Sequence, residues 1–198
     1  MGNYVYLVGS KQKEPLKAKD DSLFVLSARS ELPLFWQLLY KSVDYSMVID
    51  HEEMEYENRY PFLSTSKELA LSNAANRQDF ILSILPAKWS PLWFEFIEFL
   101  RNSDSQYIHF HQQEYACLYE PFENWGEKIQ EILSGFDSNP IFFKGRFIFR
   151  RRNLTIPWYL ALEASNISFP SFRDIRPWKL VGGEGDFAPS ERYLKMWG

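Results

Sequence analysis

Two histidines separated by a single residue are the first feature of this sequence that could carry chemistry. His109 and His111 flank Phe110, and side chains alternate along a strand, so both imidazoles would lie on one face. Glu114 follows three residues later, and two imidazoles with one carboxylate can bind a divalent metal. The alternative is a strand with two histidines on its polar face, because the third histidine, His51, is remote in sequence. We expect no metal site and no cofactor.

Glu95 and Glu98 form the most interesting carboxylate pair, because they lie at i and i+3 in an otherwise apolar segment. Burial would raise their pKa values, and they could then act as acid and base. The alternative is that they mark the solvent-facing stripe of a helix. Cys117 is the single cysteine, and its position between alanine and leucine favours a buried small residue over a nucleophile. The sequence therefore leans against an enzyme, and the glutamate and histidine pairs remain the enzymatic alternatives.

An acidic run is the strongest candidate for a binding surface. Residues 50–57 hold five carboxylates and one tyrosine, and such a cluster can steer a basic partner by electrostatic attraction. The alternative is a solvated loop. The residues expected to bind the partner are Asp50, Glu52, Glu53, Glu55, Tyr56 and Glu57.

A basic run supplies an alternative function. Residues 144–152 interleave aromatic residues with five cations, a pattern that can bind single-stranded nucleic acid by stacking and phosphate contacts. Arg146 to Arg152 would carry that function. The sequence pI is about 5.5, however, and the net charge is −4, so nucleic-acid binding is not the expected activity.

Hydrophobic periodicity predicts the elements that position these residues. Strands are expected at 3–9, 23–28, 45–49, 107–111, 115–119 and 141–149. Helices are expected at 32–40, at 71–85 behind a capping box from Thr65 to Glu68, at 92–100, at 122–136 and at 155–164. The 92–100 helix is apolar almost all round and should be buried. Residues 50–59 are interpreted as a loop or solvated helix, and 182–185 as a flexible turn.

The order of these elements favours an α+β fold, with a mainly antiparallel sheet, several packed helices and an irregular C-terminal tail from Asn166. Aromatic residues make up 18% of the 198 residues, which is ample for a core without disulfides. We expect one domain over 1–198, with a possible subdivision near 104–106. The longest apolar stretch is too short to cross a bilayer, and the single cysteine fits a reducing compartment, so we expect a cytoplasmic protein.

The N-terminal region resembles a family of bacterial proteins that begin M-G-N-x-x-Y-L and carry an L-P-x-x-W helix. The matching residues are Met1-Gly2-Asn3, Tyr6-Leu7 and Leu32-Pro33-Leu34-Phe35-Trp36, so the resemblance covers about the first 40 residues. It implies no particular activity. Small, acidic, aromatic-rich bacterial proteins are similar in type to immunity proteins that neutralise toxins. The sequence therefore suggests a non-enzymatic protein-binding module, an immunity protein that occludes the active site of a basic toxin.

Overall fold

The computed structural model describes residues 3–14, 22–50, 58–119, 121–137, 157–168 and 171–196. Within these residues, six strands form one sheet in which every neighbouring pair is antiparallel. The strand order is β3-β4-β5-β1-β2-β6. The strands are β1 (Tyr4–Ser10), β2 (Phe24–Arg29), β3 (Tyr45–Asp50), β4 (Asn58–Ser66), β5 (Tyr107–His111) and β6 (Glu184–Gly185).

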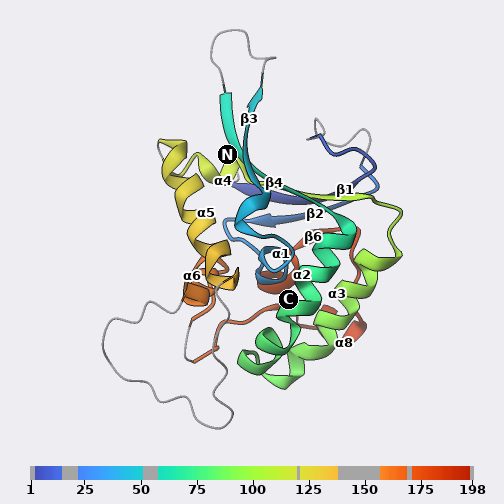
Figure 1. Ribbon diagram of the computed structural model, residues 1–198. Coiled ribbons are helices and arrows are strands. Elements are labelled where there is room, and N and C mark those ends of the chain that lie inside the picture. The colour runs from blue at the N-terminus through green and yellow to red at the C-terminus, as the bar shows by residue number, and fades with distance from the viewer. Residues whose placement is uncertain are drawn as a thin grey trace.

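Eight α-helices occur in the same residues, and Figure 1 shows α1, α2 and α3 together on one side of the sheet. The expected α+β fold with an antiparallel sheet is therefore confirmed. The helices are α1 (Leu34–Gln37), α2 (Lys67–Ile84), α3 (Ser90–Asn102), α4 (Gln113–Ala116), α5 (Phe122–Asp137), α6 (Pro157–Ala164), α7 (Pro177–Val181) and α8 (Glu191–Leu194). The same residues contain two 3₁₀ turns, η1 (Ser42–Asp44) before β3 and η2 (Ala87–Trp89) between α2 and α3.

Side-chain alternation assigns one face of the sheet to the core. Val5 and Leu7 of β1 are fully buried, whereas Tyr4 and Tyr6 are only partly buried on the opposite face. The core on the helical side is aromatic, since four tryptophans are completely buried: Trp36, Trp89, Trp93 and Trp125. Each aromatic ring of this kind removes about 150–250 Å² from water. A core of this size accounts for a stable fold without disulfides.

Helix α2 begins one residue later than the capping box predicts. Ser66 is the N-cap, and its Oγ accepts a hydrogen bond from the backbone N–H of Leu69 at 3.2 Å. Thr65 instead lies buried in β4. Helix α3 is also more amphipathic than expected, because Phe94 is 50% exposed while Trp93 is fully buried.

The expected strand at 115–119 is wrong. Residues 113–116 form the short helix α4, and Cys117 follows it as an exposed thiol, not a buried one. Part of the stretch read as a loop or solvated helix, Asn58 and Arg59, belongs to β4. The first error arises because a short run with alternating polarity does not distinguish a strand from a helical turn.

The C-terminal region is more ordered than its composition suggests. It contains α7, the two-residue strand β6 and α8, joined by irregular segments. Residues 182–185, expected to be a flexible turn, place Glu184 and Gly185 beside Ser27 and Leu26 of β2. The strand expected at 141–149 lies outside the described residues. Across the described ranges, none of the helices combines the length and apolarity that crossing a membrane requires.

Candidate functional site

The acidic run joins the far ends of strands β3 and β4. Asp50 is the last residue of β3 and pairs with Asn58, the first residue of β4. The side chain of Asp50 and residues 51–57 lie outside the described part of the chain. The residues outside it that were expected to bind a partner are Glu52, Glu53, Glu55, Tyr56 and Glu57. Chain connectivity alone fixes where their charges are attached, at the end of the β3–β4 hairpin.

This hairpin extends beyond the rest of the sheet. Strand β4 pairs with β5 only from Phe62 to Ser66, so Asn58–Pro61 pairs with β3 alone. Figure 1 shows the two strands leaving the body of the molecule as a ribbon. We call this ribbon, Met47–Asp50 paired with Asn58–Pro61, the arm. The arm places the two attachment points of the acidic run away from the helices.

Proline at position 61 indicates which backbone groups of the arm are paired. Antiparallel ladders alternate between pairs of residues that are hydrogen-bonded to each other and pairs that are not. Pro61 has no N–H to donate to Met47, its partner on β3, so this pair fits a position without hydrogen bonds. The same alternation continues along β4, because the Lys67 N–H donates to the Gln106 carbonyl on the β5 side at 2.8 Å. The N–H and C=O groups of Met47 and Ile49 therefore point away from β4. In the described residues no strand pairs with β3 on that side.

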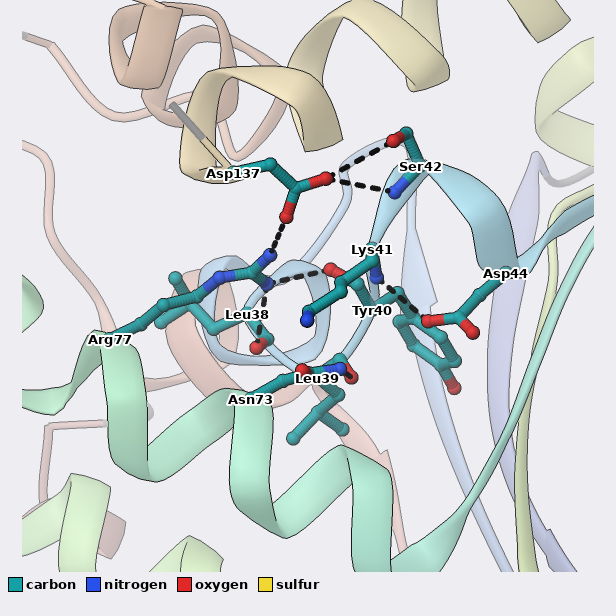
Figure 2. Close-up of polar contacts among 9 residues, drawn as sticks. All are labelled: Leu38, Leu39, Tyr40, Lys41, Ser42, Asp44, Asn73, Arg77 and Asp137. Carbon is teal, nitrogen blue, oxygen red and sulfur yellow. Dashed lines mark hydrogen bonds and ion pairs between the residues drawn. The ribbon is translucent and has the colours of Figure 1, made fainter. Parts of the chain in front are cut away.

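A buried arginine holds the chain at the base of the arm (Figure 2). Arg77 of α2 donates through Nη1 to the carbonyls of Leu38 and Tyr40, at 2.9 and 2.6 Å. Asn73, one helical turn earlier, donates to the Leu39 carbonyl at 3.0 Å. These bonds satisfy three carbonyls that follow α1 and that would otherwise be buried without partners.

Asp137 completes the base from the end of α5. Its Oδ1 accepts from Arg77 Nη2 at 2.8 Å, and its Oδ2 accepts from the N–H and Oγ of Ser42 at 3.3 and 3.1 Å (Figure 2). Burial lowers the pKa of Arg77, and the charge and hydrogen bond of Asp137 oppose that shift. The ion pair, together with the bonds from Ser42 to Asp137, thus links α2 and α5 to the turn from which β3 begins.

Asp44 caps the same turn. Its Oδ2 accepts from the Lys41 backbone N–H at 2.7 Å, and its pKa is raised, mainly by burial and against the effect of that hydrogen bond. The hydroxyl of Tyr40 is fully buried and has no hydrogen-bond partner in the described residues. Burial, reinforced by the charge of Asp44, raises the pKa of Tyr40 well above its ordinary value. The turn is thus fixed by internal contacts.

The two histidines lie on the same side of the sheet, on the face opposite the helices. His109 is fully buried, and its ring is stacked with those of Phe62 and Tyr107, at centroid distances of 5.3 and 6.4 Å. His109 and His111 are 6.3 Å apart between ring centroids. Burial lowers the pKa of His109, and burial followed by the neighbouring His109 lowers that of His111 to about 4. Both imidazoles are therefore neutral near pH 7.

The side chains proposed for a metal site are engaged elsewhere. Glu114 accepts hydrogen bonds from the Tyr4 N–H at 3.0 Å and the Tyr6 hydroxyl at 3.3 Å. Both ring nitrogens of His109 are in hydrogen bonds, and no metal-binding group of three His, Cys, Asp or Glu residues occurs in the described ranges. His51 lies outside those ranges.

Glu95 and Glu98 do not converge on one site. Glu95 accepts from the Ser190 N–H at 2.9 Å and from Arg192 at 3.2 Å, so it fastens α8 to α3. Glu98 is exposed and pairs with Arg101 one turn along the same helix. The pair therefore matches the solvent-facing stripe better than an acid and base. The basic run 144–152, with Arg146 to Arg152, lies outside the described residues.

Comparisons with protein-family models, with curated proteins and with solved structures find no match to this chain. The structure also shows a residue that sequence reasoning missed. Glu31, between β2 and α1, is only 6% exposed, and burial raises its pKa to about 7 against the opposing charge of Lys179. Its neighbourhood includes Tyr115, whose own pKa is raised by burial first and then by Tyr119. No spacing pattern marked Glu31, because the burial comes from elements distant in sequence.

An apolar pocket of about 400 Å³ lies beside β6. It is lined by Leu26, Val181, Gly182, Gly183, Glu184, Gly185, Phe187, Ala188, Pro189 and Leu194. Two of the lining glycines have positive φ, and their missing side chains are explained by contacts outside the pocket. A Cβ on Gly182 would meet Trp36, and one on Gly185 would meet Val25. Close packing against Trp36 and Val25 therefore explains why glycine occupies these two positions, without a ligand in the pocket.

Proposed function

We propose that this chain is a protein-binding module that docks onto a basic partner through the arm and the acidic run attached to its end. The observation that carries this proposal is the extension of the β3–β4 hairpin beyond the sheet, with five carboxylates in residues 50–57. A charged segment attached at the end of this hairpin would approach a partner without steric conflict from the helices. Clustered charge of one sign raises association rates by a factor of about 10–10³.

The base of the arm supports this proposal. Arg77, Asn73 and Asp137 fix the turn before β3, so the arm emerges from an ordered frame. A preorganised binding element loses less conformational entropy when it docks. The outward N–H and C=O groups of Met47 and Ile49 add a second contribution, because an extended partner segment can pair with such an edge. Electrostatic attraction would then select a basic partner and main-chain pairing would hold it.

The finer form of the proposal is that the module is an immunity protein and that its partner is a toxin. The active sites of toxins such as nucleases are positively charged, and the acidic run would cover such a site and exclude the substrate. The proposed setting is the cytoplasm, a reducing compartment that suits the exposed thiol of Cys117. The chemistry of the contact, and not a motif, supports this form.

The first test is to capture the partner with the tagged chain at low and moderate salt and to identify it by mass spectrometry. Association is then measured for a variant with Glu52, Glu53, Glu55 and Glu57 changed to Lys. We expect its association rate constant to fall at least about 10-fold at low ionic strength and its salt dependence to become weaker. Dissociation should change less, because steering acts mainly before contact.

A control variant carries the same change in net charge on exposed positions of other elements. The control changes four carboxylates to Lys: Asp79, Glu131, Glu163 and Glu191. We expect it to retain most of the association rate at moderate salt. Equal losses in both variants would show that only net charge matters, and unchanged binding in the first variant would refute docking through the acidic run.

A further inference from the structure

Residues Lys11–Glu14, which we call the strap, follow β1 and hydrogen-bond to the histidine face. The Gln12 carbonyl lies 2.9 Å from Nε2 of His109, and the Lys13 carbonyl lies 3.3 Å from Ser64 Oγ, within reach of its hydroxyl proton. Ser64 Oγ also lies 3.0 Å from Nδ1 of His109. Three groups that are far apart in sequence thus form one connected line: carbonyl, imidazole, hydroxyl.

The carbonyl fixes the protonation pattern of the imidazole. A carbonyl oxygen can only accept, so Nε2 of His109 carries the proton that is donated to Gln12. In the neutral ring Nδ1 then has a free lone pair, which lies 3.0 Å from Ser64 Oγ. The single hydroxyl proton of Ser64 therefore has two acceptors, Nδ1 and the Lys13 carbonyl at 3.3 Å, and the orientation toward Nδ1, the nearer of the two, is the one that proton transfer uses. Burial keeps His109 neutral by lowering its pKa, although the bond to Gln12 and the charge of Glu14 act in the opposite direction. His109 is therefore set up as a base toward Ser64.

The sheet register holds the two side chains at this separation. Ser64 and His109 are direct cross-strand partners in the β4–β5 ladder. The Lys67 N–H points to β5, so by alternation Ser64 sits at a position without hydrogen bonds across the pair, where side chains are closest. Phe62 and Tyr107 pack beside the imidazole and limit its rotation. The contact between Ser64 and His109 is therefore set by the pairing of β4 with β5.

We propose that Ser64 is an activated nucleophile, with His109 as its general base and the Gln12 carbonyl as the group that orients the base. A hydroxyl, a base within hydrogen-bond reach and a third group that orients the base are the parts that activate serine in acyl transfer. Ser64 is only partly buried, whereas His109 is inaccessible, so the hydroxyl is the member of the set that a substrate can reach. This site is separate from the arm and does not depend on the proposed docking function.

The chemical step is a nucleophilic substitution. The Ser64 Oγ–H proton passes to Nδ1 of His109 as Oγ forms a bond to the carbonyl carbon or phosphorus of an ester. The bond to the leaving group breaks, and that group takes the bonding electron pair and, if it is an alkoxide, the proton from the imidazolium. The product is an ester of Ser64. Because the partly exposed ring of Tyr107 lies beside the imidazole, we assign an uncharged ester with an apolar or aromatic group as the substrate class.

The test uses the full chain and an uncharged alkyl fluorophosphonate, with p-nitrophenyl acetate as the carboxylic ester. We expect one fluorophosphonate adduct, with loss of fluoride, and peptide mapping by mass spectrometry should place it on Ser64. Ser46 provides an internal control, because it is exposed on the same face of the sheet but its cross-strand partner is Phe62 and not a histidine. Ser64 should react at least about 100-fold faster than Ser46, the range that general-base catalysis supplies.

Two variants separate activation from exposure. Ser64→Ala should abolish the adduct, and His109→Gln should slow it at least about 100-fold while the circular dichroism spectrum stays unchanged. Denaturing the wild-type chain in guanidinium should remove the difference between the two serines, which provides the same information if His109→Gln does not fold. Absence of an adduct on Ser64, or equal labelling of Ser64 and Ser46 in the folded chain, would overturn the proposal.

Discussion

Glu31→Gln should make the protein more stable in alkaline solution, which is the reverse of what loss of a native side chain usually does. Glu31 is 6% exposed, and burial raises the pKa of its carboxyl from an ordinary value of 4.5 to about 7, with Lys179 opposing the shift. The folded state therefore holds the proton more tightly than the unfolded state. Above pH 7 the buried carboxyl must ionise in a poorly solvated position.

The sign follows from proton linkage. Because the folded-state pKa is the higher one, the contribution of Glu31 to stability is fully present below pH 4.5 and is lost as the pH rises through about 7. The two pKa values differ by about 2.5, which at about 1.36 kcal/mol per pKa unit corresponds to about 3.4 kcal/mol. Glutamine is neutral at every pH and has nearly the same volume. Its advantage over glutamate should therefore grow by about 2.5 kcal/mol between pH 5 and pH 8.

The assay is urea unfolding of the wild type and Glu31→Gln at pH 5 and pH 8, followed by tryptophan fluorescence. With a slope of about 2–3 kcal/mol per molar urea for a chain of this size, the difference between the two midpoints should increase by about 1 M from pH 5 to pH 8. The matched control is Glu163→Gln, an exposed carboxyl of α6. A midpoint difference that is the same at both pH values would refute the link between the burial of Glu31 and its pKa.

Three further substitutions test how the fold is held together. Arg77→Met should lower the free energy of unfolding by about 3 kcal/mol, because the carbonyls at the base of the arm lose their donor and Asp137 loses its cation. Asp137→Asn should lower it by less, since the side chain of Asp137 is 30% exposed. Urea midpoints at pH 7 measure both, and a loss below about 1 kcal/mol for Arg77→Met would contradict the role of the network. Gly182→Ala should destabilise by about 1–3 kcal/mol, because φ is +93° and a Cβ would lie 2.5 Å from Cζ2 of Trp36; a melting temperature equal to that of the wild type would refute this.

Much of the fold could be predicted from the sequence where the hydrophobic pattern is long. Helix α5 spans Phe122–Asp137, close to the 122–136 expected from its apolar face, and α3 contains the expected 92–100 segment. Strands β1 and β2 also match their expected ranges to within about two residues. In each case one periodic face is buried against the body, so the local pattern and the tertiary structure favour the same element.

The elements that were missed are those in which local and tertiary preferences differ. Most of β4 was not expected to be a strand, since its first residues follow a charged stretch and Pro61 lies within it. The ladder tolerates proline there because that residue need not donate to β3. Residues 115–119 were expected to be a strand, yet Gln113–Ala116 form the helix α4, and the Ala116 N–H donates to the Gln112 carbonyl at its start.

The candidate site was less predictable than the fold because its contacts join distant parts of the chain. The sequence indicated that His109 and His111 share a face, which the structure bears out, but it could not supply Ser64, which is 45 residues away. Likewise, nothing near Arg77 in sequence marks Asp137, its partner 60 residues away. Both contacts depend on strand register and helix packing, which a single sequence does not specify.

Strand β4 connects the two functional proposals, since it contributes to each with a different part of its length. Asn58–Pro61 forms one side of the arm, and Phe62–Ser66 places Ser64 beside His109. A slip of one residue in the β4–β5 register would turn Ser64 toward the helices and bring Thr65 to the histidine face. It would also carry Pro61 out of the position where its missing N–H costs nothing. The register of β4 thus determines whether Ser64 lies beside His109 and which backbone groups of the arm are available to a partner.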